Sequence, residues 1–311
     1  MDSMKKYFVI ESTDESTDLN GVIWHSDETK NPKAILQIVH GMAEYIERYD
    51  ELANFLNENN ILVVGHDHLG HGDSLDLENP LYGYFSKGES ATVLVEDTYQ
   101  ITNYIKKRYP TIPLFILGHS MGSFVVRNYL KTYSGKVDGA ILMGTGGKKE
   151  EVTVAKRLLK GLNTISPKTV NPALHHLYFN SYNKKIKHAT SANAWLSKNE
   201  ANIKAYEEDE KCGFIFTNNG FYTLINLVDG ATKKNWFKTI RPDLPVLLVS
   251  GEKDPVGNYG KIPRKIAVEL TDNYFSNVTL RLYHDLRHEI LNEEEKEDVM
   301  NDIYDWMTNH L

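Results

Sequence analysis

The amino-acid sequence predicts an α/β fold in which a mostly parallel central sheet carries helices on both faces. Three observations support this prediction. Short apolar runs alternate with segments of helical periodicity along most of the chain. Several runs, such as AILQIV and ILVVG, are apolar at nearly every position, which is typical of strands buried on both faces. The 311 residues suffice for one large domain, or for one domain with an insertion.

The first part of the chain predicts strands of two kinds. Residues 7–10 and 21–25 are short strands on either side of a polar, turn-like stretch. Residues 34–39, 61–65 and 113–117 have the buried pattern. The segments between the buried strands have helical spacing and comprise residues 44–59 and 89–109.

The alternation breaks in the middle of the chain and then resumes. A helix ending near residue 133 and a strand at 137–143 continue the α/β pattern. Strands follow again at 245–250 and 278–283, and a last helix covers about 292–309. Between them the sequence is helical and loop-rich, with no clear strand run. We therefore predict a core formed by residues 1–146 and 236–311, interrupted by a helical cap at 147–235.

Composition and charge exclude several classes of protein. The net charge is −7, from 35 basic and 42 acidic residues, and no basic stripe suggests a nucleic-acid partner. Cys212 is the only cysteine, so neither an intrachain disulfide nor a cysteine zinc site can form. No apolar stretch approaches the length of a signal peptide core or a membrane span. These features predict a cytoplasmic protein.

A serine lies between two glycines where a predicted strand becomes a helix. The stretch LFILGHSMGSFVVRNYL contains Gly118, Ser120 and Gly122 in the pattern Gly-x-Ser-x-Gly. In the nucleophile elbow this turn is so tight that the neighbours of the serine must lack side chains. The serine then projects at the carboxyl edge of the sheet, where the following helix directs its positive end. The pattern therefore predicts that Ser120 is a nucleophile.

A serine hydroxyl needs a base, and the base needs an acid to orient it. In folds with this elbow the acid and the histidine follow the serine in that order. Asp254 comes just after the strand at 245–250, and His288 lies in the loop after the next strand. Asp254 also suits a plain turn before a proline, and His284 is a rival base. We predict Asp254 and His288, because His288 lies deeper in the loop.

Two backbone N–H groups are expected to bind the oxyanion. Met121, directly after the nucleophile, is one donor. Met42 is the other, in the loop VHGMAEY after the strand at 34–39, where Gly41 lets the backbone turn toward the substrate. An ordinary strand-to-helix turn is the alternative interpretation of that loop.

The run HDHLGH suggests a competing metal site. Its spacing is close to the histidine run of metallo-hydrolases, but Gly70 stands where those proteins carry an aspartate before the last histidine, His71. The ligand set is therefore incomplete. We predict that these histidines pack and hydrogen-bond beneath the active site, with neither a metal nor a cofactor.

Five blocks of sequence resemble a known group of proteins. VHGMAEYIERY, GHDHLGHGDS, LGHSMGS, SGEKDPVG and RHEILNE resemble the α/β-hydrolases that include monoacylglycerol lipases and bacterial lysophospholipases. The resemblance covers about residues 33–291 and is weaker through the insertion. It implies a serine hydrolase with a helical cap, the triad Ser120, Asp254 and His288, and oxyanion donors Met42 and Met121. Family members cleave esters of fatty acids, and some cleave short acyl esters.

The substrate remains open among monoacylglycerols, lysophospholipids and short acyl esters. A proline-type aminopeptidase or amidase is the alternative, and it would need an acidic site for the substrate amine, such as residues 207–209. A non-catalytic, hydrolase-like binding protein is a third hypothesis, which the complete set of candidate residues disfavours. The sequence does not predict an oligomeric state.

An apolar helix face in the predicted cap has two interpretations. Phe221, Leu224, Ile225 and Val228 have the i, i+3, i+4, i+7 spacing of one helix face. The face either covers an acyl-chain pocket, with transient contact of the cap with a membrane surface, or packs the cap on the core.

Overall fold

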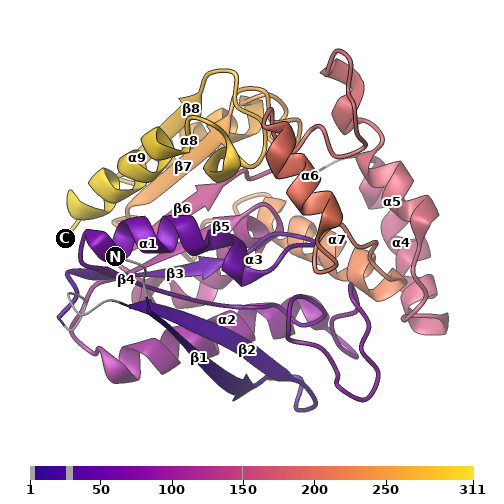
Figure 1. The fold of residues 1–311 in the computed structure, drawn as a ribbon, viewed down its shortest axis with the longest axis horizontal. Helices are drawn as coiled ribbons and strands as arrows, with labels where there is room; N and C mark the ends of the chain where they lie inside the picture. Colours follow the sequence, from indigo (N-terminus) through magenta and orange to yellow (C-terminus); the bar gives the residue numbers. More distant parts are fainter. Residues whose placement is uncertain (1–3, 26–30, 149) are drawn as a thin grey trace.

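The computed structural model describes residues 4–25, 31–148 and 150–311, which form an eight-stranded sheet with helices on both faces (Figure 1). The strand order is β1-β2-β4-β3-β5-β6-β7-β8. The six strands from β4 to β8 in this order are parallel to one another, and β2 runs antiparallel to both of its neighbours, β1 and β4. The strands are β1 (Met4–Glu11), β2 (Asp18–His25), β3 (Ala34–Val39), β4 (Ile61–His66), β5 (Leu114–His119), β6 (Gly139–Met143), β7 (Val246–Gly251) and β8 (Val278–Tyr283). The predicted fold class is confirmed.

Alternate residues of the central strands enter two different hydrophobic clusters. Leu36 and Ile38 of β3 pack with helices α1 (Asp50–Glu58) and α9 (Lys296–Thr308). Ile35 and Val39 of the same strand pack on the opposite face. That face is covered by α2 (Ser90–Arg108), α3 (Met121–Tyr133) and α8 (Lys261–Thr271). Helices therefore cover both faces of the sheet. In such a fold, a ligand reaches the sheet at the carboxyl ends of the parallel strands.

The helix predicted at 44–59 begins later than expected. Ala43 has a φ of 52°, and the Glu44 carboxylate accepts a hydrogen bond from the N–H of Gly41. This side-chain bond favours a turn over a helix. A short 3₁₀-helix, η2 (Ile46–Tyr49), follows, and α1 starts only at Asp50. The described residues also form the 3₁₀-helices η3 (Ser134–Lys136), η4 (Tyr182–Lys185) and η5 (Ile290–Asn292).

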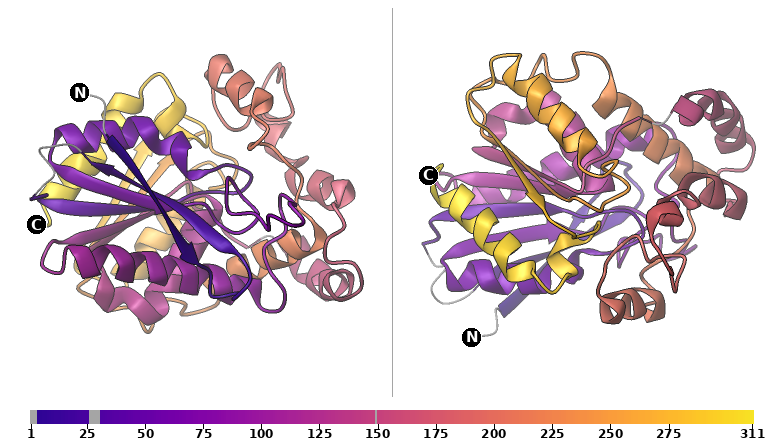
Figure 2. Two further views of the ribbon diagram at one scale, coloured as in Figure 1. Left: turned by 60° about the horizontal axis from the view of Figure 1, so that its bottom comes forward. Right: turned by 90° about the horizontal axis from the view of Figure 1, so that it is seen from above.

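The predicted cap is helical where it is described, and it contributes no strand to the sheet. Its helices are α4 (Glu150–Ile165), α5 (Pro172–Phe179), α6 (Glu200–Glu208) and α7 (Asn218–Thr232). Helices α4 and α5 lie at the edge of the molecule opposite the C-terminus (Figure 1 and Figure 2). Residues 1–3 and 26–30 of the predicted core, and residue 149 of the predicted cap, lie outside the described residues. In the described chain, no helix has both the length and the apolar character of a membrane span.

Helix α7 belongs to the main hydrophobic core. It packs along α3, and its apolar face joins the cluster that covers the sheet. Phe221, Ile225 and Val228 are buried in that cluster, and only Leu224 of the face also lines the cavity that contains Ser120. Packing on the core therefore accounts for most of the apolar face of α7.

Candidate active site

Ser120 occupies a strained turn between β5 and α3. Its φ is 51° and its ψ is −116°, and its N–H donates to the carbonyl oxygen of Met143 at the end of β6 (2.9 Å). A Cβ atom on Gly118 would collide with the carbonyl of Gly122, and one on Gly122 would collide with the carbonyl of Val39. Both glycines are therefore required by the close approach of neighbouring backbone.

The two predicted oxyanion donors, Met42 and Met121, line the same cavity as Ser120. Met121 is the first residue of α3, so its N–H belongs to the group that a helix leaves without an internal partner. Met42 lies in the loop after β3, and no hydrogen bond of the described residues uses its N–H. A Cβ on the adjacent Gly41 would lie 3.2 Å from the Ser120 Cβ, so this loop passes directly beside the serine.

Asp254 and His288 form a buried pair. Asp254 follows β7, His288 follows β8, and the His288 Nδ1 lies 3.0 Å from Asp254 Oδ2. Both side chains are almost fully buried, at 0% and 2% exposure. Asp254 also accepts a hydrogen bond from the N–H of Val256 (2.8 Å), which fixes the carboxylate. The rival His284 has an 87% exposed side chain and contacts Glu252 instead.

Ser120 and His288 line the same cavity, whose volume is about 300 Å³. Met42 and Met121 line it as well. Its wall also contains seven aromatic residues: Phe124, Tyr178, Phe179, Tyr182, Trp195, Tyr206 and Phe214. The structure thus brings together an elbow serine, a histidine–aspartate pair and an apolar binding space.

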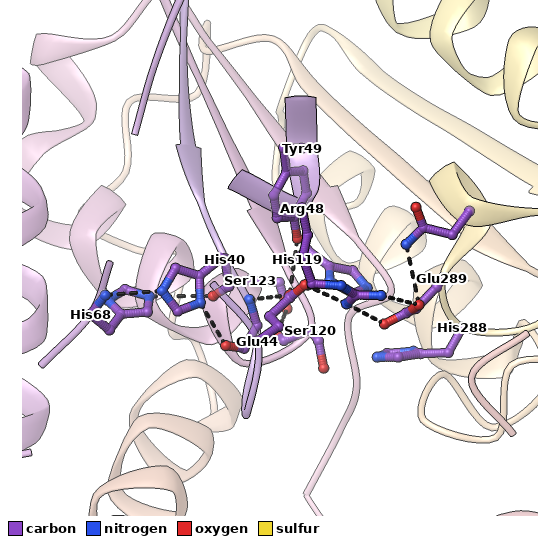
Figure 3. Close-up of polar contacts among 12 residues, drawn as sticks. His40, Glu44, Arg48, Tyr49, His68, His119, Ser120, Ser123, His288 and Glu289 are labelled. Atoms are coloured by element: carbon purple, nitrogen blue, oxygen red, sulfur yellow. Dashed lines mark hydrogen bonds and ion pairs between the residues drawn. The ribbon is translucent and has the colours of Figure 1, made fainter. Parts of the chain in front are cut away.

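A chain of buried charges lies beside these residues (Figure 3). Glu44 accepts hydrogen bonds from Arg48 (2.9 Å) and Tyr49 (3.0 Å), and its Oε1 is 3.0 Å from His119 Nδ1. Arg48 makes two further bonds to Glu289, at 2.7 and 2.9 Å. The chain of charges connects three segments: the loop after β3, the end of strand β5 next to Ser120, and the loop that carries His288.

The charges of this chain stabilise one another. Burial alone raises the pKa of a carboxyl group, but His119 and Arg48 hold the pKa of Glu44 well below its usual range. Burial likewise opposes ionisation of Glu289, and Arg48 lowers the pKa of that carboxyl. The pKa of the Arg48 guanidinium is raised despite burial, chiefly by Glu289. Each carboxylate therefore keeps its charge because the guanidinium lies between them.

A segment of the predicted cap is fastened to the His288 loop. The N–H of Glu289 donates to the carbonyl of Leu196 (2.7 Å), and Arg287 donates to the carbonyls of Ala194 and Ser197 (both 2.7 Å). These bonds flank Trp195, whose ring centroid lies 5.0 Å from that of His288. This segment thus lies against the imidazole, and the His288 side chain is only 2% exposed.

The sequence interpretation missed this charge chain and this cap segment. One signal was available, because Glu44 and Arg48 are spaced i, i+4 in VHGMAEYIERY. Glu289 and Trp195 had no such signal, since nothing in the sequence places residue 195 against residue 288.

The histidines of HDHLGH are buried and pack with His40. The ring centroids of His40 and His68 are 4.4 Å apart, and those of His66 and His68 are 5.2 Å apart. His40 Nε2 accepts a hydrogen bond from the N–H of His68 (2.9 Å). Among the described residues, no group of three or more histidine, cysteine or acidic side chains is placed to hold a metal ion.

Burial makes these histidines resist protonation. It lowers the pKa of His66 and His71 to about 4 and that of His40 to about 3, and it lowers the pKa of His68 well below its usual range. Burial also raises the pKa of two carboxyl groups, that of Asp67 to about 6 and that of Asp97 by a smaller amount.

We expect the free energy of unfolding to fall as the pH decreases from about 6.5 to about 4. Over this range His40, His66, His68 and His71 are protonated in the unfolded chain but stay neutral in the folded protein, which favours unfolding. Asp67 and Asp97 bind protons more readily in the folded protein and oppose this effect. A net difference of about two protons corresponds to about 3 kcal/mol per pH unit. Denaturant unfolding at several pH values measures this slope. Stability that stays level or increases toward pH 4 would contradict the assignment.

Comparison with known proteins places this architecture in a family. The model of the Hydrolase_4 family, described as serine aminopeptidase S33, matches residues 30–295. A monoacylglycerol lipase of Mycolicibacterium smegmatis is 26% identical over 299 residues, which cover 93% of this chain and 92% of that protein. A monoglyceride lipase of Rattus norvegicus is 43% identical over 94 residues, but these span only 30% of this chain and 29% of the lipase.

Solved structures show the same fold. A thermostable carboxyl esterase from Bacillus coagulans, in complex with glycerol, has a TM-score of 0.90 at 23% identity, with 98% of both chains covered. A monoglyceride lipase from Saccharomyces cerevisiae has a TM-score of 0.75 at 17% identity, covering 100% of this chain and 96% of that one. The resemblance predicted from the five sequence blocks is confirmed, and the chain belongs to the Hydrolase_4 family of α/β-hydrolases.

Proposed function

We propose that this protein hydrolyses carboxylic esters through an acyl-enzyme on Ser120. The observation that carries the proposal is the buried His288–Asp254 pair, 3.0 Å apart, in the same apolar cavity as the elbow serine. A strained serine, a base and an orienting acid on three different loops are the components of acyl transfer.

In the proposed mechanism, Ser120 Oγ attacks the ester carbonyl and His288 Nε2 accepts its proton. Asp254 keeps the proton of His288 on Nδ1 and stabilises the imidazolium. The N–H groups of Met42 and Met121 bind the oxyanion of the tetrahedral intermediate. The intermediate collapses as His288 protonates the leaving alcohol, and water, activated by His288, releases the acid by the same steps. The scheme requires no cofactor.

An acyl ester of lipid type suits the cavity best. The wall is mainly aromatic and aliphatic, which favours an acyl chain over a polar substrate. The similarity to the monoacylglycerol lipase of Mycolicibacterium smegmatis extends over nearly the full length of both chains. It supports a monoacylglycerol or a related ester as the substrate. We include in the proposal a transient contact of the cap with the lipid surface that holds such esters. We also propose a cytoplasmic location, supported by the single cysteine.

The aminopeptidase alternative has less support, although the family description names that activity. An aminopeptidase needs a carboxylate that is available to the substrate amine. Among the described residues, Glu44 and Glu289 are the acidic side chains in the cavity wall, and both already bind Arg48. Asp209 bonds to Tyr45, and Glu207 bonds to Ser191, outside that wall.

A substrate panel tests the proposal. Initial rates would be measured with p-nitrophenyl esters of increasing acyl length, with monoacylglycerols, and with aminoacyl anilides that include proline. We expect hydrolysis of the esters, and kcat/KM for them at least about 100-fold above that for the anilides. Faster cleavage of an aminoacyl anilide would overturn the proposal in favour of the peptidase.

A further inference from the structure

Positive charge is concentrated in one continuous stretch of the predicted cap. Residues 152–199 contain eight lysine and arginine residues and no aspartate or glutamate. The whole chain has 35 basic and 42 acidic residues, so the remainder holds 27 basic and all 42 acidic ones, a net charge of −15. A basic segment on an acidic protein is not expected from solubility alone, because a uniformly acidic surface would serve that purpose.

Basic and large apolar side chains are exposed together on this stretch. Arg157 and Lys160 are exposed on α4, and Lys184 is exposed in η4. None of the three takes part in an ion pair among the described side chains, unlike Lys156, which binds Asp229. The apolar members are Leu158, Ile165 and Leu177, with exposures of 63%, 84% and 64%. We name the exposed residues 157, 158, 160, 165, 177 and 184 the basic face.

The basic face lies beside the opening of the active-site cavity. His176, Asn180 and Ala192 line the cavity and are also exposed, so the cavity reaches the surface within this same stretch. Helices α4 and α5, which carry most of the basic face, form the outer edge of the molecule (Figure 2). A surface that bound this edge would meet the cavity opening directly.

We propose that the basic face docks the protein on an anionic lipid surface. Lysine and arginine are attracted to acidic headgroups, and exposed leucine and isoleucine side chains enter the boundary between headgroups and acyl chains. A nucleic acid would attract the same cations but would offer no apolar phase for the three aliphatic side chains. The combination of both kinds of residue therefore favours the membrane.

This inference deepens the proposed function by naming the kind of surface that supplies the substrate. Its role in catalysis rests on the proposed ester hydrolysis, whereas the binding to lipid does not. Docking would bring ester substrates from the lipid to the cavity opening. Binding can be measured without turnover, so a failure to bind anionic lipid and a failure to hydrolyse esters are separate results.

Vesicle sedimentation tests the proposal. The full-length protein would be mixed with vesicles of phosphatidylcholine alone, or with about 30% phosphatidylglycerol. We expect binding to the mixed vesicles that weakens steeply between about 0.1 and about 0.5 M salt, because screening acts on exposed charges. Equal binding to both kinds of vesicle, or binding to neither, would overturn the proposal.

Charge reversal locates the surface. The triple variant Arg157→Glu, Lys160→Glu and Lys184→Glu should bind the mixed vesicles roughly 100-fold more weakly. Each lysine or arginine near an anionic surface contributes roughly a fivefold factor to the binding constant, and three such factors multiply to about 100. A charge-matched control reverses three exposed bases elsewhere, Lys107→Glu, Arg108→Glu and Lys136→Glu. Equal weakening by both triple variants would show a general charge effect and would overturn the assignment to the cap.

The apolar part has its own variant. Ile165→Ser should weaken binding roughly tenfold at every salt concentration, since it removes one aliphatic side chain from the lipid boundary. Hydrolysis of a water-soluble short-chain ester should be unchanged in all of these variants, which shows that they are folded. Unchanged vesicle binding by Ile165→Ser, together with unchanged binding by the cap triple variant, would refute the basic face as the docking site.

Discussion

The Ser120→Ala variant is expected to lose ester hydrolysis by about 10⁴-fold or more while remaining folded. Without the hydroxyl, no acyl-enzyme can form, and only the oxyanion donors and the binding cavity remain. Alanine has the same Cβ atom at the same strained φ of 51°, so the turn should persist. Steady-state rates with a p-nitrophenyl ester measure the loss, and thermal unfolding verifies the fold.

Ser123→Ala provides a matched control for that result. Ser123 lies one turn further along α3, and its hydroxyl donates to the carbonyl of Ser120 (2.6 Å) and contacts Thr145 (2.9 Å). It is buried and cannot attack a substrate in the cavity. A fluorophosphonate probe should therefore label Ser123→Ala but not Ser120→Ala. Labelling of Ser120→Ala, or substantial residual hydrolysis by it, would refute the assignment of the nucleophile.

The Arg48→Ala variant is expected to lose about 3–5 kcal/mol of unfolding free energy. Arg48 is the common partner of Glu44 and Glu289, whose side chains are only 5% and 3% exposed. Removing the guanidinium leaves Glu289 buried without this counter-charge and leaves Glu44 with His119 as its remaining ionic partner. Denaturant unfolding at neutral pH measures the loss.

Two further variants separate charge from shape. Arg48→Lys keeps the positive charge but cannot reproduce the paired bonds to Glu289, so an intermediate loss is expected. Glu289→Gln in the Arg48→Ala background should recover part of the stability, because it removes the unpaired charge. If Arg48→Ala unfolds with the stability of the wild type, the charge chain does not stabilise the fold.

The activity of Arg48→Ala should also decrease, for a geometric reason. The charge chain connects the loop that carries Met42 with the loop that carries His288. Loosening either loop misplaces an oxyanion donor or the base relative to Ser120, and displacements of about 1 Å can lower rates by about 100-fold. We expect the change mainly in kcat, with a smaller change in KM, because Arg48 also lies over the ring of Tyr206 in the cavity wall (5.0 Å to the centroid).

Local patterns in the sequence were sufficient to predict the sheet and to single out candidate reactive residues. Strands buried on both faces must be apolar at nearly every position, so β3, β4, β5 and β7 could be recognised directly. The elbow requires glycines at two positions near Ser120, because backbone atoms occupy the space of a side chain there. The order of serine, acid and histidine, each after a strand, indicated Asp254 and His288.

Other features depend on contacts between distant segments. The helix expected from residue 44 starts at Asp50, because Glu44 bonds to the backbone of Gly41 instead of pointing to solvent. The apolar face of α7 could have covered substrate or packed on the core, and only the position of α3 decided that most of it packs. A helical periodicity shows that a face is buried, but it does not show against which partner.

The sequence by itself thus determined the fold class and predicted the strained serine turn with its candidate partners, because each depends on short-range sterics or on strand order. Only the tertiary structure decided which histidine of the last loop faces Asp254, how Arg48 joins two acidic side chains 245 positions apart, and which cap residue covers the imidazole. These are long-range contacts between side chains, and neither periodicity nor spacing encodes the distance between them.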